Sequence, residues 1–298
     1  MNTSPICECD GKRNVKQAVI GIYAHVDAGK TTLAEAMLYD AGRIRRLGRV
    51  DRGDSHLDTD AMERDRGITI FAAQAELEHA GARLTLVDAP GHVDFGAEAE
   101  RILAALDYAI LVVAANDGVQ GHTRTLWRLL ERHGVPTFVF VNKVDLLPDA
   151  GSAGEKDVLL AELCRRLSEG CVDAVALGDP AGQEAAATSD EAALDEYLEA
   201  GCLAPATLRR LVSGRRVFPC FFGSALRNEG VAELLDGVAD LVGECSWPSE
   251  FAARVYRVTR SDRGERLAWL KVTGGELRAK QQVSGVSCGS PWSEKVNE

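Results

Sequence analysis

The sequence predicts an α/β fold, with a mostly parallel, six-stranded sheet flanked by helices and a smaller β region after it. The first observation is that apolar runs alternate with amphipathic stretches of helix length over residues 17–243. The runs at 108–115 (YAILVVAA) and 137–141 (TFVFV) are almost wholly apolar, as is typical of parallel strands covered on both faces. The second observation is that short alternating patterns separated by glycine turns replace this order after residue 250.

The predicted elements follow this alternation. The sheet strands are expected at 17–24, 75–79, 83–87, 108–115, 137–141 and 217–222, with a further strand signal at 68–73. The helices are expected at 30–41, 123–132, 158–168, 191–199 and 231–241. Strands of the second region are expected at 253–259, 266–272 and 281–286.

The chain length of 298 residues favours two unequal domains. We expect residues 1–16 to form a flexible N-terminus and 17–243 to form the main domain. Within it the alternation loosens at 147–216, which we interpret as an insertion at the edge of the domain. Residues 244–250, which include a Ser-Trp-Pro-Ser stretch, are the expected linker to a partial β domain at 251–298.

Composition narrows the classes of function. The net charge of -11 argues against broad affinity for nucleic acid. Five arginines nevertheless crowd the charged segment 42–67, where they form either a solvated face or a local contact with RNA phosphates: Arg43, Arg45, Arg46, Arg49 and Arg52. The eight cysteines form no C-x-x-C pair, which favours reduced thiols. No signal region or membrane-spanning apolar run is visible, so the expected location is cytoplasmic, without a membrane partner.

A phosphate-binding loop is predicted at residues 24–32 (AHVDAGKTT), between an apolar strand and an amphipathic helix. Backbone N–H groups at such a turn point inward together, and the helix dipole adds positive charge. Lys30 would reach the β- and γ-phosphates, and the Thr31 hydroxyl would ligate Mg²⁺. Ala24 stands where the general pattern has its first glycine.

The segment DAPGH (88–92) directly follows the predicted strand 83–87. Asp88 at the strand end could hold Mg²⁺ through water. Gly91 would let its backbone N–H approach a γ-phosphate. His92 would then face the attacking water. The alternative for His92 is a structural or surface histidine, but its position directly after Gly91 favours the catalytic interpretation.

The segment RGITI (66–70) joins the charged segment to a strand signal. Thr69 could bring its hydroxyl to Mg²⁺ and its N–H to the γ-phosphate, which would order the segment only when a triphosphate is bound. The alternative is an ordinary loop-to-strand joint.

The segment NKVD (142–145) follows the apolar strand 137–141, where α/β folds place ligand contacts. The Asp145 carboxylate can accept two hydrogen bonds from guanine, a pair that adenine cannot supply. The Lys143 stem can lie along the base. After the last core strand, the small residues Ser224 and Ala225 would let a backbone N–H reach the guanine carbonyl, although an ordinary small-residue turn is the alternative.

These five motifs occur in one order, each at a strand end, and together predict a P-loop GTPase domain. Residues 18–242 resemble the GTP-binding domain of translational GTPases through AHVDAGKTTL, RGITI, DAPGHVDF, NKVD and GSAL. Within that family, elongation factor G and the tetracycline-resistance ribosomal protection proteins look nearest. LGRVDRG, TLAEAMLY and ERLAWLKVTGGEL favour the ribosomal protection type.

The resemblance implies a Mg²⁺-dependent enzyme that converts GTP to GDP and phosphate and is activated by the sarcin–ricin loop of the ribosome. It implies that His92 positions the hydrolytic water and that Val26 and Ile68 form a hydrophobic gate before it. The implied metal ligands are Thr31, Thr69 and Asp88. The implied phosphate contacts are Asp27, Ala28, Gly29, Lys30, Thr31, Thr32, Thr69 and Gly91. The implied guanine contacts are Asn142, Lys143, Asp145, Ser224 and Ala225.

Two departures from the family pattern accompany this resemblance. Gly121-His122 replaces an expected glutamine-containing pattern, at a place that we expect to lie away from the chemistry. The second domain holds only about half of the expected β-barrel, below the roughly 80–100 residues that such a domain needs, so we expect a fragment. The favoured role is ribosomal protection by a monomer. An elongation factor G-like translocase fragment and a non-hydrolysing GTP-binding switch are the alternatives.

Overall fold

The computed structural model describes residues 16–46, 73–88, 102–149, 152–243 and, with short interruptions, 248–295. Four predicted site residues lie outside these ranges: Ile68, Thr69, Gly91 and His92. The strand signal at 68–73 also lies outside them except for Ala73. The chain divides into two compact units, Met1–Cys245 and Ser246–Glu298, and each is described by itself.

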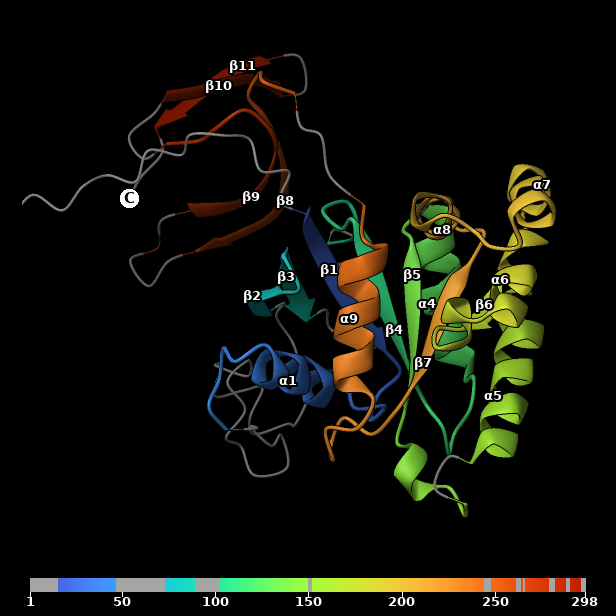
Figure 1. The fold of residues 1–298 in the computed structure, drawn as a ribbon. Coiled ribbons are helices and arrows are strands. Elements are labelled where there is room, and N and C mark those ends of the chain that lie inside the picture. The colour runs from blue at the N-terminus through green and yellow to red at the C-terminus, as the bar shows by residue number, and fades with distance from the viewer. Residues whose placement is uncertain are drawn as a thin grey trace, which may run out of the picture. The chain divides into compact units, whose positions relative to one another are not determined.

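The first unit is built on one mostly parallel sheet (Figure 1). Its strands lie in the order β2-β3-β1-β4-β5-β7-β6, and β2 alone pairs in the antiparallel sense with its neighbour. Their bounds are β1 Lys16–Ala24, β2 Ala73–His79, β3 Ala82–Asp88, β4 Tyr108–Ala114, β5 Thr137–Asn142, β6 Cys171–Asp173 and β7 Phe218–Phe222. The prediction of an α/β fold with a mostly parallel sheet is confirmed.

The sheet has seven strands, so the prediction of six is wrong by one. The extra strand is β6, which comes from the predicted insertion and pairs with β7 at the edge of the sheet. With only three residues, β6 is too short to show the alternation that identifies strands in a sequence. The preceding Gly170 permits this pairing, because a Cβ there would lie 2.2 Å from the carbonyl oxygen of Arg216.

Helices cover both faces of the sheet because successive strand residues point to opposite sides. Ile22 and Ile110 belong to a core shared with α1 and α9, whereas Tyr23 and Leu111 belong to a core shared with α4 and α5. The helix bounds are α1 Lys30–Asp40, α4 Gly121–Arg132, α5 Ala153–Arg166 and α9 Val231–Leu241. Buried aliphatic strands between two helical layers explain the uniformly apolar sequences of β4 and β5.

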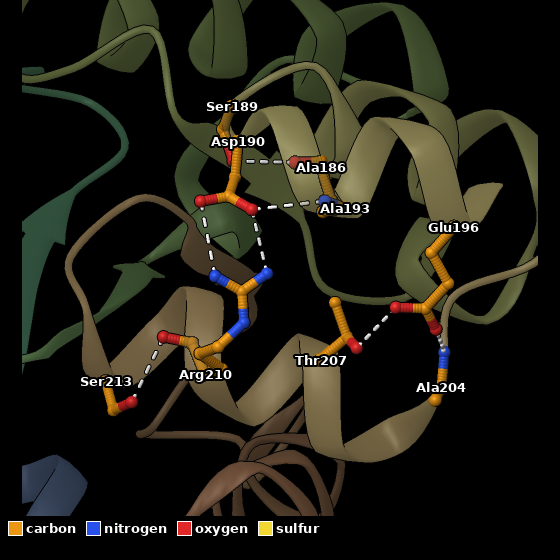
Figure 2. Close-up of polar contacts among 9 residues, drawn as sticks. All are labelled: Ala186, Ser189, Asp190, Ala193, Glu196, Ala204, Thr207, Arg210 and Ser213. Carbon is orange, nitrogen blue, oxygen red and sulfur yellow. Dashed lines mark hydrogen bonds and ion pairs between the residues drawn. The ribbon is translucent and has the colours of Figure 1, made fainter. Parts of the chain in front are cut away.

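The predicted insertion adds three further helices beside β6: α6 Pro180–Ala187, α7 Glu191–Ala200 and α8 Pro205–Ser213. Polar contacts tie α7 to α8 (Figure 2). The Asp190 carboxylate accepts hydrogen bonds from the Ala193 N–H and from both terminal nitrogens of Arg210. Glu196 accepts hydrogen bonds from the Ala204 N–H and the Thr207 hydroxyl. This region is therefore a structured subdomain of helices, although only its 191–199 helix and part of α5 were predicted.

The second unit contains two antiparallel strand pairs within its described residues. β8 (Ala252–Arg260) pairs with β9 (Arg266–Gly274), and β10 (Gln282–Ser287) pairs with β11 (Ser290–Lys295). The start of a β-barrel in this unit remains a prediction. Among the helices that the structure describes in either unit, none is long and apolar enough to cross a membrane.

Candidate nucleotide-binding site

The predicted motifs meet at one edge of the sheet because the parallel strands end there in register. β1 pairs with β3 up to Ile22, which lies opposite Asp88 at the end of β3, and with β4 up to Ala24, which lies opposite Val112. β4 and β5 likewise end together, with Ala114 opposite Asn142. The carboxyl edge of a parallel sheet is where α/β proteins bind ligands, so strand order alone assembles a candidate site.

The phosphate loop turns sharply between β1 and α1. The Ala28 N–H donates to the His25 carbonyl oxygen over 3.1 Å, and Asp27 takes a left-handed conformation with φ 61°. Gly29 has φ 91°, and a Cβ there would lie 2.3 Å from Asn142 Nδ2, so only glycine fits. Ala24 is a buried β1 residue without a positive φ, which explains why the glycine of the general pattern is dispensable there.

Lys30, Thr31 and Asp88 converge beside the loop. The Lys30 ammonium pairs with one oxygen of the Asp88 carboxylate, and the Thr31 hydroxyl donates to the other over 3.0 Å. The Asp88 side chain is 1% exposed and that of Lys30 is 9% exposed. A hydroxyl and a carboxylate side by side are oxygen donors of the kind that Mg²⁺ prefers, so Thr31 and Asp88 fit the predicted metal.

Asn142 joins the phosphate loop to the last motif. Its Nδ2 donates to the Ala28 carbonyl oxygen over 2.8 Å, and its Oδ1 accepts from the Ala225 N–H over 2.9 Å. The side chain is 3% exposed and satisfied on both sides. The Ala225 N–H, expected to reach a guanine carbonyl, is thus engaged by Asn142 in this structure. Asn142 therefore fixes the distance between the two loops.

The predicted base-recognition residues lie on two tight turns. Lys143 has φ 65°, and Asp145 follows it in a short 3₁₀ turn, η3 (Val144–Leu146), with its side chain 8% exposed. Residues 224–229 form a small loop closed by backbone hydrogen bonds between Ser224 and Glu229. We call these residues the closing loop. The residue directly before this loop, Gly223, must be a glycine because a Cβ there would lie 2.1 Å from the Glu229 carbonyl oxygen.

Two side chains of the closing loop join the site without having been predicted from the sequence. Leu226 is 51% exposed directly after Ala225, and Arg227 Nε lies 3.2 Å from Asp145 Oδ2. The only available signal was their position directly after the small residues 224–225, since contacts between separate loops leave no periodic pattern in a sequence.

One expectation about this edge is wrong. The ring centroid of His122, at the start of α4, lies 5.8 Å from that of His25 in the phosphate loop. His122 therefore adjoins the site that it was expected to avoid. The reason is that the β4–α4 connection leaves the same sheet edge as the phosphate loop.

The structure brings the described residues of the predicted set to this one edge: Val26, Asp27, Ala28, Gly29, Lys30, Thr31, Thr32, Asp88, Asn142, Lys143, Asp145, Ser224 and Ala225. The other half of the predicted hydrophobic gate, Ile68, and the residues Thr69, Gly91 and His92 lie outside the described ranges. The site thus joins a phosphate loop, the predicted metal-binding pair and the predicted base-recognition carboxylate, an arrangement typical of a P-loop nucleotide-binding domain.

Comparison with known proteins identifies the family. Residues 16–244 match the family described as the elongation factor Tu GTP binding domain, and the chain belongs to it. It is therefore a GTP-binding domain of the type found in translation elongation factors.

Several curated proteins are similar to this chain. The oxytetracycline resistance protein of Streptomyces rimosus is 39% identical, with 89% of this chain and 43% of that protein covered. The tetracycline resistance protein TetM of Streptomyces lividans is 37% identical, with 89% and 45% covered. Elongation factor G 1 of Geobacter sulfurreducens is 34% identical, with 91% and 48% covered. The chain thus spans less than half the length of these relatives.

A solved structure supports the fold. A crystal structure of a protein from Thermus thermophilus superposes with a TM-score of 0.79 at 24% identity, covering 94% of this chain and 48% of that one.

Proposed function

We propose that this chain binds GTP with Mg²⁺ and hydrolyses it to GDP and phosphate when a ribosome stimulates it. The observation that carries the proposal is the double contact of Asn142. It holds the phosphate loop and the closing loop together, with Asp145 three residues further along the chain. A buried carboxylate at that place selects guanine, because only guanine offers it two N–H donors.

In this proposal different residues bind the phosphates, the metal ion, the attacking water and the base. The N–H groups of 27–32 and the Lys30 ammonium bind the phosphates, while Thr31, Asp88 and Thr69 hold Mg²⁺, which would supply charge stabilisation at the phosphates. Gly91 contacts the γ-phosphate, and His92 orients water behind the gate of Val26 and Ile68. Asn142, Lys143, Asp145, Ser224 and Ala225 are the proposed contacts of the base, which would take over the Ala225 N–H that Asn142 engages in this structure.

We propose ribosomal protection against tetracycline as the wider role, since relatives named for tetracycline resistance are 32–39% identical. An elongation factor G-like translocase is the second candidate, favoured by a relative of that name at 34% identity. The proposed partner is the sarcin–ricin loop of a cytoplasmic ribosome, bound by a monomer. We also propose the division into 1–16, 17–243 with the insertion 147–216, the linker 244–250 and a partial β-barrel at 251–298.

His92→Ala tests the enzymatic part of this proposal. The variant should keep its affinity for GTP and lose about 10²–10⁴-fold of ribosome-stimulated phosphate release, because water positioning and proton transfer contribute about that much. The matched control is His133→Ala, at an exposed histidine after α4, which should release phosphate as the unaltered chain does. Equal stimulated rates for His92→Ala and the unaltered chain would refute the role of His92. GTP binding without any stimulated turnover would favour a non-hydrolysing switch.

A further inference from the structure

Arg227 contacts the carboxylate that reads the base. Its Nε lies 3.2 Å from Asp145 Oδ2, and its side chain is 55% exposed whereas that of Asp145 is 8% exposed. A carboxylate with so little access to water needs a compensating charge or hydrogen bonds. The guanidinium supplies a compensating charge before any nucleotide arrives.

The closing loop fixes the place of Arg227. The Arg227 N–H donates to the Ser224 carbonyl oxygen over 3.1 Å, and the backbone groups of Ser224 and Glu229 bond to each other. The adjacent Asn228 has φ 57°, and its Nδ2 donates to Asp40 at the end of α1. The guanidinium therefore projects from an anchored turn, which lowers the entropy cost of holding it against Asp145.

The contact leaves room for the base. An ionised carboxylate has about four acceptor positions, and guanine uses two of them. The contact of the arginine runs from Nε to Oδ2, and the carboxylate has acceptor positions beyond it, so guanine and Arg227 can be bound by Asp145 at the same time. Support of the carboxylate is therefore a better interpretation of the contact than competition with the base.

Resting on the proposed function, we propose that Arg227 is a positioning residue for guanine recognition, which supplies a counter-charge to the Asp145 carboxylate and holds it in place for the base. It acts through Asp145 and is a determinant of guanine specificity beyond the residues of the two recognised motifs.

The test is a binding cycle with GDP and xanthosine diphosphate, measured by titration calorimetry on the full chain. Arg227→Gln should weaken GDP binding about five- to tenfold, and Arg227→Lys should weaken it less because the charge remains. Arg83→Gln is the matched control. Arg83 on β3 is 51% exposed and pairs with Glu78 on the edge strand β2, with β1 and β4 between β3 and the strand β5 that leads to Asp145. It should bind GDP as the unaltered chain does.

The decisive arm uses Asp145→Asn, which should move the preference from guanine to xanthine. In that background Arg227→Gln should change xanthosine diphosphate affinity by less than about twofold, since the two residues act as one unit. If Arg227→Gln lowered nucleotide affinity by the same factor in the Asp145→Asn background as in the unaltered chain, the role of Arg227 would be merely structural and the inference would be overturned. Unchanged or tighter GDP binding by Arg227→Gln, with its thermal unfolding midpoint unaltered, would also overturn it. Failure of the unaltered chain to bind GDP would instead refute the proposed function.

Discussion

Asp88 and Asp190 are both carboxylates paired with a basic side chain, yet their surroundings differ sharply. The Asp88 and Lys30 side chains are 1% and 9% exposed at the sheet edge, whereas those of Asp190 and Arg210 are 21% and 51% exposed between α7 and α8. The second pair has the better geometry, with two N–H···O contacts from one guanidinium (Figure 2). Burial, more than geometry, therefore distinguishes the pair for which we propose a ligand-binding role.

The buried pair is costly to keep and costly to break. Two charges removed from water lose hydration that their mutual attraction only partly replaces. A buried ion pair of this kind fits a place where charge has a task, and the proposed phosphate and metal binding would provide one. The exposed pair holds two helices of the insertion together at little desolvation cost.

Among the substitutions that test this difference between the two ion pairs, Lys30→Met is expected to have the largest effect. The variant keeps an unbranched apolar stem but leaves the buried Asp88 without its ammonium, which should cost about 3–5 kcal/mol in the free energy of unfolding. GTP binding should be lost as well. Urea unfolding and nucleotide titration measure the two effects. The matched control, Arg210→Met, removes the cation of the exposed pair and should change unfolding far less, with GTP affinity intact. Equal losses in both variants would break the distinction between the two pairs.

Gly29→Ala should have the next largest effect. Gly29 and Gly42 both have positive φ, 91° and 69°, but a Cβ at Gly29 would lie 2.3 Å from Asn142 Nδ2, whereas one at Gly42 meets open space. Gly42→Ala should therefore cost only the backbone term, about 1–2 kcal/mol. Gly29→Ala should cost about 2 kcal/mol more through the displaced Asn142, and should weaken GDP binding. Urea unfolding and GDP titration of both variants check this. If both variants lost the same free energy of unfolding and kept their GDP affinity, the Asn142 side chain would be able to move aside at no cost.

The sequence predicted those parts of the molecule whose physics is local. β4 and β5 were predictable because buried parallel strands are apolar throughout, and the site followed because motif residues stand at strand ends. The short β6 carries no such signal. α6 and α8 begin with Pro180 and Pro205, a helix-start signal that their weakly patterned surroundings concealed.

Contacts between loops were beyond prediction for a different reason. The pairing of Arg227 with Asp145 joins residues 82 positions apart, and the approach of His122 to His25 depends on where the β4–α4 connection leaves the sheet. Neither has a periodicity or spacing of its own. Both become visible only once strand order is known.

The smallest predicted effect concerns the exposed network of the insertion. The hydrogen bond from Arg210, followed by that from the Ala193 N–H, lowers the pKa of Asp190. The Thr207 hydroxyl, followed by the Ala204 N–H, lowers the pKa of Glu196. Because both pKa values are lower in the folded state, the stabilisation is present above the ordinary carboxyl values of about 4 and is lost as the pH falls through the lowered ones.

Arg210→Met separates these two carboxylates, and carboxyl ¹³C NMR titration measures them. The pKa of Asp190 should rise toward its ordinary value, because the largest cause of its shift is removed. The pKa of Glu196 should change little, because its main partners are a hydroxyl and a backbone N–H that the substitution leaves in place. A parallel rise in both would mean that the substitution had unfolded the α7–α8 contact. In that case the exposed pair would hold the insertion together as firmly as the buried pair holds the site.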